Sequence, residues 1–298
     1  MPTVTRIEPG AFDPAADSGP AAALRRVVEA AATTDGAAPL DEAALLALRH
    51  GLGGTELWLA GEDGFAWRHD GALDLAVHPE ARRRGAGTAL AGAATAEPGP
   101  LTAWSHGHHL AAAVLAGRSG FEAVRDLWVM RRPLADLPEP PRPDAGPADG
   151  IDVRTFEVGR DEEAFLAVNA EAFAHHPEQG GLTRDGLEER KAQPWFDPAG
   201  FFVAVRREDG RLVGFHWTKV HDADPPYGEV YVVGVSPRAQ GGGLGRRLTL
   251  TGLQHLASRG LEEVLLYVEA DNAPAVAVYR RLGFRHEPQD THVQYARR

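Results

Sequence analysis

The chain has 298 residues and a formal net charge of −11, from 31 basic and 42 acidic side chains. This length exceeds that of one typical domain, so we expect two hydrophobic cores. The acidic balance argues against binding to nucleic acid, whose phosphates attract basic proteins. The chain has no cysteine, which excludes disulfides, thiolate catalysis and cysteine metal ligands. No apolar stretch approaches the roughly 20 residues of a membrane span, and no signal-peptide pattern is present, so a cytoplasmic protein is expected.

The first half of the chain is predicted to contain two helices, a three-stranded meander, and then a helix, a strand and a helix. Apolar residues that recur with helical or strand periods support these assignments. The expected elements are helices at 21–32 and 40–50, strands at 56–60, 64–68 and 73–77, an alanine-rich helix after the turn 82–87, a strand at 101–104 and a helix at 110–117.

A proline-rich segment separates the two halves of the chain. Residues 133–150 contain six prolines in a polar setting, which is typical of a semi-rigid linker. The second half is then predicted to contain a strand at 151–156, helices at 161–174 and 184–191 around a loop at 175–181, strands at 201–206, 213–220 and 229–235, a helix after the glycine-rich turn 240–245, a strand at 264–268, a helix that carries Tyr279, and a strand at 291–297 that closes the second sheet.

The turn at 240–245 has the composition of an anion-binding loop. It follows a strand rich in β-branched residues and opens a helix on which Leu244, Leu248, Gly252 and Leu256 share one face. The N–H groups at a helix N-terminus favour an anionic ligand, and glycine lets a pyrophosphate approach closely. The sequence Gln-Gly-Gly-Gly-Leu-Gly lacks both the lysine of a Walker loop and the third glycine of a dinucleotide fingerprint.

The chain contains an internal duplication. Val77–Gly87 repeats Val235–Gly245 with an offset of 158 residues, and Gly120-Phe121 repeats Gly283-Phe284. The duplication predicts two copies of one α/β unit. We expect an N-terminal domain at 1–132, a linker at 133–150 and a C-terminal domain at 151–298.

The two copies carry different side chains at corresponding positions. Counted from the repeated motifs, Glu229 corresponds to Gly71 and Tyr279 corresponds to Ala116. The first copy keeps a glycine-containing loop with three arginines at 82–84, but it lacks this carboxylate and this phenol. We therefore expect chemistry only in the second copy.

The Gln-x-x-Gly-x-Gly spacing at 240–245 resembles the acyl-CoA loop of the GNAT superfamily of N-acetyltransferases. The segment 272–284, in which Tyr279 precedes Gly283-Phe284, is similar to the second hallmark of that superfamily. The resemblance implies an α/β fold (α+β mixed sheet) of two tandem GNAT domains, each a mostly antiparallel mixed sheet flanked by helices. It also implies acetyl-CoA as co-substrate, and in the first copy a fold that binds acetyl-CoA without catalysis.

Acetyl transfer to an amine requires that one proton leave the ammonium and that the departing thiolate be stabilised or protonated. By its position in the GNAT pattern, Glu229 is the expected base, and Tyr279 is the expected acid. A direct attack on the thioester needs no enzyme nucleophile, which is consistent with the absence of cysteine. Backbone donors on the splayed strand can polarise the thioester carbonyl.

Each of these residues also has a structural interpretation. A glutamate at a strand end is often solvated, and Tyr279 shares a face with apolar residues that could place it in a core. Tyr267 could be a core residue or a partner of a substrate hydroxyl. Lys219 is one of two lysines in an arginine-rich chain, which favours a specific contact. The histidines at 106, 108 and 109 lack the spacing of a metal site, and we expect no metal.

Segments over nearly the whole chain resemble the mycothiol synthase family. They are 36–42, 172–180, 195–198, 214–219 and 266–272. That family transfers acetyl from acetyl-CoA to the cysteinyl amine of cysteinyl-glucosaminyl-inositol. The resemblance implies substrate contacts at Glu42, Glu178, Lys219, Glu229 and Tyr267.

The same resemblance implies two acetyl-CoA sites. In the second copy the residues are Val233, Gly234, Val235, Gln240, Gly241, Gly242, Gly243, Leu244, Gly245, Arg246, Asn272, Ala273, Pro274, Ala275, Val276 and Ala277. In the first copy they are Leu75, Ala76, Val77, Arg82, Arg83, Arg84, Gly85, Ala86 and Gly87. The pair Gly241-Gly242 departs from the family, in which arginines commonly precede the Gly-x-Gly.

Two alternatives remain from the sequence. One is a tandem acetyltransferase for another small amine, such as an aminoglycoside. The other is a non-catalytic acyl-CoA sensor, against which the combination of Glu229 and Tyr279 argues. We expect a monomer with no nucleic-acid or membrane partner.

Overall fold

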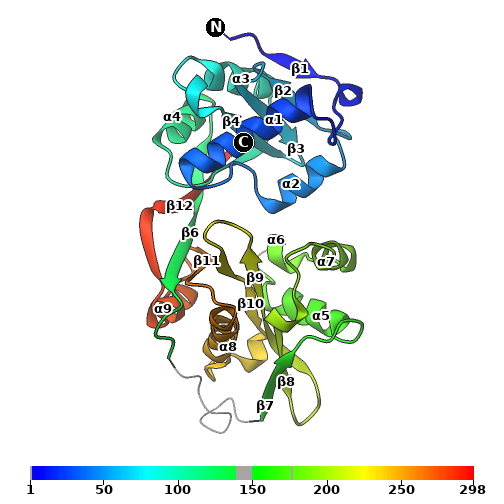
Figure 1. The fold of residues 1–298 in the computed structure, drawn as a ribbon, viewed down its shortest axis with the longest axis vertical. Helices are drawn as coiled ribbons and strands as arrows, with labels where there is room; N and C mark the ends of the chain where they lie inside the picture. Colours follow the sequence, from blue (N-terminus) through cyan, green and yellow to red (C-terminus); the bar gives the residue numbers. More distant parts are fainter. Residues whose placement is uncertain (1, 139–149, 176) are drawn as a thin grey trace. The chain divides into compact units, whose positions relative to one another are not determined.

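The computed structural model describes residues 2–138, 150–175 and 177–298, and of Pro177 and Glu178 it describes the backbone alone. The described chain divides into two compact units (Figure 1). Unit 1 comprises the residues up to Trp128 together with Glu269–Asp271 and Glu287–Arg298. Unit 2 comprises Val129–Val268, apart from the undescribed positions, and Asn272–His286. Each unit is therefore built from segments of both halves of the chain.

Unit 1 contains a mixed sheet with helices on both faces. Its strand order is β1-β2-β3-β4-β5-β12, followed by the first part of β6. Helices α1 and α2 bury their apolar stripes against one face, whereas α3 packs against the other. The elements are β1 (Thr5–Ile7), α1 (Pro20–Asp35), α2 (Glu42–Arg49), β2 (Glu56–Leu59), β3 (Gly64–His69), β4 (Ala72–Val77), α3 (Ala86–Ala94), β5 (Leu101–Ser105), α4 (Leu110–Arg118), β6 (Glu122–Pro133) and β12 (Arg285–Arg297).

Unit 2 contains a second mixed sheet of the same design. From the last part of β6, its strand order continues β11-β10-β9-β8-β7. Helix α5 belongs to an aromatic-rich core on one face, and α8 packs on the opposite face. The elements are β7 (Ile151–Thr155), α5 (Glu162–Ala172), α6 (Pro177–Gly180), α7 (Arg184–Lys191), β8 (Phe201–Arg206), β9 (Leu212–His221), β10 (Tyr227–Val235), α8 (Leu244–Ser258), β11 (Glu263–Glu269) and α9 (Ala273–Arg281).

The helices and strands predicted from apolar periodicity are confirmed to within a few residues at their ends, with four differences. The loop predicted at 175–181 contains the short helix α6 (Pro177–Gly180). The short strand β1 was not predicted. The long strand β6 was not predicted either, although it spans twelve residues. The fourth difference concerns the partner of the last strand.

The prediction that residues 291–297 close the second sheet is wrong. Val293 lies opposite Ser105 and Arg297 lies opposite Leu101, so β12 pairs antiparallel with β5 of the first copy. Correspondingly, the last part of β6 lies beside β11 in unit 2, where Arg131 pairs with Glu263 at 3.2 Å. The two copies thus exchange their final strands. The division at 133–150 stays a prediction about the duplicated sequence, since residues 139–149 lie outside the described part of the structure.

Helix α8 lies close to its sheet because the facing positions are glycine. A Cβ atom at Gly252 would stand 2.1 Å from the His216 ring, and one at Gly228 would stand 2.8 Å from the Leu256 side chain. His216 is fully buried in this contact, and its Nδ1 lies 2.8 Å from the carbonyl oxygen of Leu248. Burial lowers the pKa of His216 to about 4, so the ring is neutral and donates through Nδ1. These contacts fix α8 relative to β9 and β10.

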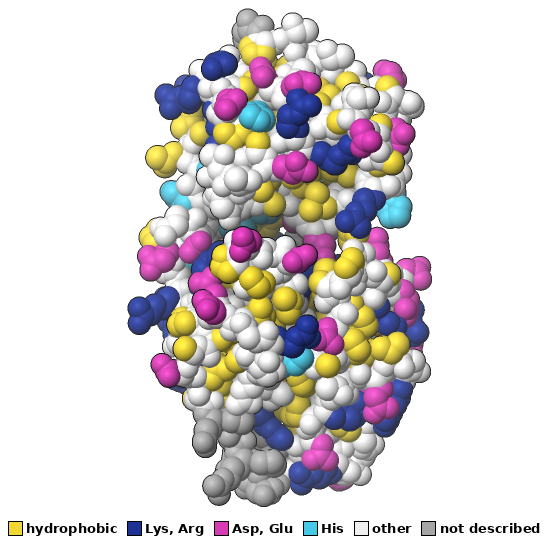
Figure 2. All heavy atoms as spheres, in the orientation of Figure 1, with side chains coloured by type: hydrophobic (Ala, Val, Ile, Leu, Met, Phe, Trp, Pro, Cys, Tyr) yellow, Lys and Arg dark blue, Asp and Glu magenta, His cyan; other side chains and the backbone are white. Residues whose placement is uncertain are grey.

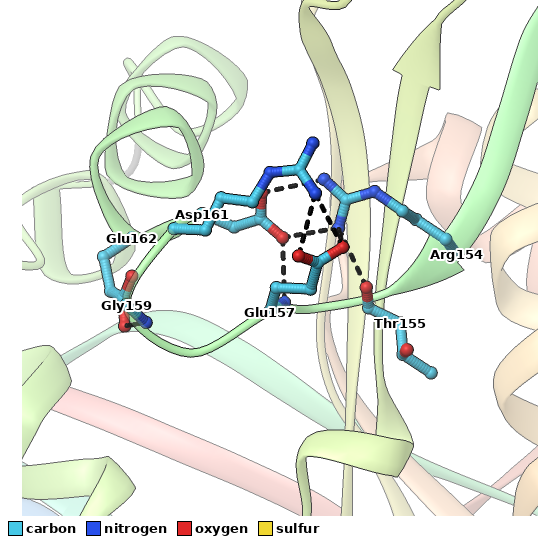
Figure 3. Close-up of polar contacts among 7 residues, drawn as sticks. Arg154, Thr155, Glu157, Gly159, Asp161 and Glu162 are labelled. Atoms are coloured by element: carbon cyan, nitrogen blue, oxygen red, sulfur yellow. Dashed lines mark hydrogen bonds and ion pairs between the residues drawn. The ribbon is translucent and has the colours of Figure 1, made fainter.

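A cluster of ion pairs joins the start of α5 to β7 (Figure 3). Arg154 donates to both carboxylate oxygens of Asp161 at 2.5 and 2.8 Å, and the same carboxylate accepts the N–H of Glu157 at 2.8 Å. The hydrogen bond from Arg154 lowers the pKa of Asp161. Beside this cluster, Lys191 of α7 donates to Glu162 at 2.8 Å. The loop before α5 is therefore held by charge-assisted hydrogen bonds.

We expect Asp161→Asn to lower the free energy of unfolding at neutral pH by about 2 kcal/mol, because it weakens hydrogen bonds that Arg154 makes to a charged acceptor. The folded-state pKa of Asp161 is depressed, so the stabilisation is present above the unfolded pKa, near 4, and is lost as pH falls through the folded value. Urea unfolding at pH 7 and pH 3 measures both effects. Asp152→Asn, at an exposed ion pair with Arg207, is the control. A loss that is the same at both pH values would contradict this account.

Candidate functional site

The loop that opens α8 offers unpaired backbone donors. Gly241 and Gly243 have φ angles of 86° and 79°, in the left-handed region that glycine adopts without strain. Gly243 is the N-cap, and it provides no side-chain cap for the first turn of α8. Gln240 donates through Nε2 to the carbonyl oxygen of Val235 at 3.1 Å, which ties the loop to the end of β10. The turn predicted to bind an anion therefore leads into a helix N-terminus that has no side-chain cap.

The strand that leads into this loop separates from its parallel neighbour. Only Gly228, Glu229 and Val230 of β10 lie in register with β11 among the described residues. On the other side, the register of β10 with β9 shifts between Val230 and Val232, which marks a bulge at Tyr231. A bulge bends a strand and interrupts its ladder. The edge of β10 from Val232 to Val235 is thus open to an extended ligand whose anionic end reaches the loop.

Glu229 is a buried carboxylate at the start of this opening. Its residue is 6% exposed, and its Oε2 lies 2.6 Å from Nε2 of His221. Lys219 lies directly opposite Glu229 on β9, and its Nζ stands 4.5 Å from the ring centroid of Trp195 and 5.3 Å from that of Tyr231. Such cation–π contacts fix the position of a lysine amine and leave its charge in place. The predicted residues Glu229 and Lys219 therefore share one face of the sheet.

Sequence reasoning missed His221. The available signal was its spacing, since His221 is two residues after Lys219 on the same strand and so lies on the same face. Its ring stacks on Tyr227 with centroids 4.4 Å apart and an interplanar angle of 14°.

Tyr279 lies on α9, near the helix C-terminus. It is half-buried, and its ring meets Phe284 edge-on at 5.8 Å. Burial raises the pKa of Tyr279 to about 12, so the phenol holds its proton at neutral pH. The helix begins after Asn272, whose side chain accepts the N–H of Ala275 at 3.2 Å. The phenol can therefore serve as a proton donor.

The other predicted substrate residues lie on separate elements. Tyr267 is 44% exposed on β11 of unit 2. Glu42 is the first residue of α2 in unit 1. The side chain of Glu178 lies outside the described part of the structure. The predicted acetyl-CoA residues of the second copy lie on the end of β10, the loop before α8, the first turn of α8, the N-cap Asn272 and the first residues of α9.

Unit 1 contains a groove of about 940 Å³ between β4, β5 and α4. Most of the predicted first-copy residues line it, as does Ala116, whereas Arg84 and Ala86 do not. Arg82 donates to both oxygens of Asp35 at 2.7 and 2.6 Å, so its charge is paired. His106 also lines the groove, and burial lowers its pKa, which keeps the ring neutral. The groove is therefore less basic than three consecutive arginines suggested.

Comparison with known proteins identifies the family. Residues 166–284 match the acetyltransferase (GNAT) family. A mycothiol acetyltransferase of Nocardioides sp. is 53% identical over 292 residues, which cover 93% of this chain and 97% of that protein. One of Actinosynnema mirum is 51% identical over 298 residues, covering 95% and 97% of the two chains. The chain belongs to the mycothiol acetyltransferase family.

Solved structures agree with the fold of this member of the mycothiol acetyltransferase family. A GCN5-related N-acetyltransferase from Sphaerobacter thermophilus superposes with a TM-score of 0.66 at 26% identity, covering 99% of this chain and 95% of that chain. A tandem GNAT protein from the clavulanic acid biosynthesis pathway superposes with a TM-score of 0.61 at 22% identity, covering 81% of this chain and 82% of that chain. At this identity the likeness shows the fold alone. The predicted tandem GNAT architecture is confirmed.

The surface of this mycothiol acetyltransferase family member is mixed in charge. Figure 2 shows acidic and basic side chains interspersed over the visible face. No helix in the described part of the chain has both the length and the apolar character needed to cross a membrane.

Proposed function

We propose that this protein transfers the acetyl group of acetyl-CoA to the cysteinyl amine of cysteinyl-glucosaminyl-inositol, the last step of mycothiol biosynthesis. The relatives named mycothiol acetyltransferase support the substrate. The observation that carries the chemistry is the combination in unit 2 of an uncapped helix N-terminus, a buried carboxylate and a phenol whose proton is retained. A minimal test is turnover of the purified protein with acetyl-CoA and this amine.

The proposed co-substrate would bind along β10 and the loop before α8. The pyrophosphate would accept hydrogen bonds from the first turn of α8, beside Arg246. The pantetheine arm would lie along the unpaired edge of Val233–Val235, where backbone N–H groups are free to bind an extended amide chain. The thioester would then lie near the bulge at Tyr231, and backbone donors there would polarise its carbonyl.

Three proton transfers complete the proposed reaction. Glu229 takes a proton from the substrate ammonium, which exposes the nitrogen lone pair for attack on the thioester carbon. As the C–S bond breaks, Tyr279 gives its hydroxyl proton to the CoA sulfur. The second proton that the nitrogen loses as the amide forms then returns to the Tyr279 oxygen. The high pKa of Tyr279 suits this step, because it keeps the proton on the phenol until the thiolate forms.

The acceptor would be bound by charge and by hydroxyl recognition. Glu229 and Glu178 suit the cationic amine, whereas Lys219, held over Trp195, suits the oxygen atoms of the sugar and inositol. Tyr267 and Glu42 are proposed as further contacts. A panel of other small amines, including aminoglycosides, separates this substrate from the alternative.

We also propose that the groove of unit 1 binds acetyl-CoA without turning it over. Its loop repeats that of unit 2, with Gly85 at a φ angle of 92° as the N-cap of α3. Ala116 lines the groove at the position that corresponds to Tyr279. The groove thus has a place for the ligand and lacks the phenol.

Tyr279→Phe is expected to lower kcat on the order of 100- to 10,000-fold, the usual contribution of a general acid. The affinity for acetyl-CoA should change little, because the ring keeps its contact with Phe284. Steady-state kinetics and acetyl-CoA titration measure the two quantities. A decrease of less than a few-fold in kcat, or an effect on melting temperature alone, would rule out the acid role.

Glu229→Gln is expected to be slow at neutral pH and to recover at alkaline pH, where the substrate amine is already neutral. The substitution keeps the shape of the side chain and removes the proton acceptor. The pH profile of kcat/KM between pH 6 and pH 10 tests this. If the variant keeps the wild-type profile, water or another carboxylate is the base.

The two loops can be compared by matched substitutions. A Cβ atom at Gly245 would lie 3.8 Å from the Val235 side chain, and one at Gly87 would lie 3.5 Å from that of Val77. Alanine therefore fits at both positions, whereas tryptophan would fill the space beside the strand. Gly245→Trp should abolish activity, while Gly87→Trp should leave kcat largely intact and remove one of two bound acetyl-CoA molecules in calorimetry. The alanine variants are the controls. Equal loss of kcat from both tryptophan variants would refute the division of roles.

A further inference from the structure

The proposed mechanism leaves one side chain at the site without a role. His221, the last residue of β9, lies with its Nε2 2.6 Å from Oε2 of Glu229. The carboxylate side chain is 8% exposed and the imidazole 26%. The imidazole ring also stacks on Tyr227, so it is held both at its edge and on one face.

The chemistry of the carboxylate decides which partner donates the hydrogen bond. An ionised carboxylate has acceptor sites only, so at 2.6 Å the imidazole must donate its Nε2–H to Glu229. In the neutral ring the second nitrogen, Nδ1, then carries a lone pair. A second proton binds there and makes the ring an imidazolium.

We propose that His221 is a positioning residue for the acetyl transfer. Its Nε2–H holds the Glu229 carboxylate in the orientation that receives the ammonium proton, and its charge sets how readily Glu229 accepts that proton. This inference rests on the proposed function, because it requires Glu229 to be the base. With His221 neutral, the carboxylate is oriented and basic. With His221 protonated, the imidazolium stabilises the carboxylate in its charged form, weakens it as a base and repels the substrate ammonium.

Other charged and titratable side chains surround Glu229 and His221. Lys219 faces Glu229 from β9, with its amine over aromatic rings. Tyr227 faces the imidazole from β10, and burial followed by the charge of Glu229 raises its pKa. Arg131 on β6 and Glu263 on β11 act on Tyr227 from the next strands.

The proton count of the reaction is unchanged by His221. One ammonium N–H bond breaks and its proton passes to Glu229, while the freed nitrogen lone pair forms the bond to the thioester carbon. The electron pair of the C–S bond leaves with the sulfur, which takes the proton of Tyr279. A second N–H bond breaks as the amide forms, and its proton returns to the Tyr279 oxygen. His221 exchanges no proton with the substrate and acts through Glu229.

Two substitutions separate the hydrogen bond from the titration. His221→Gln keeps an N–H donor at the place of Nε2 and removes the ionisation. His221→Phe keeps a ring that can stack on Tyr227, but it removes both the N–H donor and the ionisation. We expect H221F to lower kcat/KM on the order of 10- to 100-fold at pH 8, the size of one charge-assisted hydrogen bond. We expect H221Q to stay within about threefold of wild type at pH 8 and to shift the acid limb of the kcat/KM profile lower by about one pH unit.

The experiment measures kcat/KM from pH 5 to pH 9 with acetyl-CoA and the cysteinyl pseudodisaccharide, together with melting temperatures. Wild-type kinetics in H221F, or a wild-type acid limb in H221Q, would overturn the inference. A lower melting temperature in both variants, with an unshifted acid limb of the kcat/KM profile, would assign His221 a structural role and would also overturn the inference. Glu229→Gln separates a failure of the proposed function from a failure of the role of His221. If this variant is fully active, the proposed base is wrong. If it is impaired while both histidine variants match wild type, only the role of His221 is wrong.

Discussion

The candidate site in unit 2 depends on one constraint, the end of parallel pairing between β10 and β11. A fully paired strand has no backbone groups left for a ligand, whereas β10 is released after Val230 and bends at the Tyr231 bulge. The release opens a strand edge that leads directly to the uncapped N-terminus of α8. Glu229 lies on the last paired stretch, where β9 and β11 hold it on both sides. The open strand edge and the buried carboxylate thus lie on either side of one irregularity in the sheet.

This arrangement is the kind through which an acidic protein would bind a polyanion. The net charge of −11 would repel CoA at long range, but a ligand at the loop before α8 would meet backbone N–H groups and a helix dipole, which are insensitive to the sign of distant side chains. In unit 1 the charge of Arg82 is already paired with Asp35, so an anion at the repeated loop would also depend on backbone donors. The buried carboxylate of Glu229 has local partners, since His221 lies 2.6 Å away and Lys219 lies opposite it on β9.

Local patterns in the sequence predicted the elements of the fold and the glycine-rich turn that opens α8, because glycine spacing and apolar periodicity act over a few residues. They could not predict the partner of β12, since the two copies are similar enough that residues 291–297 fit either sheet. They also could not predict His221, because its role depends on the register that places it beside Glu229. The pairing of Arg82 with Asp35 likewise joins residues 47 positions apart. Long-range pairings were missed where side-chain type alone leaves several partners possible.

The exchange of final strands has a consequence for the history of the duplicated chain. If the chain were cut between its copies, the first would lose β12 from beside β5, and the second would lose the β6 segment that borders β11. Each fragment would expose an unpaired strand edge, which invites aggregation. Once this exchange was established, neither copy could be deleted or separated without damage to the other. The first copy, with Gly71 and Ala116 at the positions of Glu229 and Tyr279, can thus be retained as an obligatory part of its neighbour's sheet.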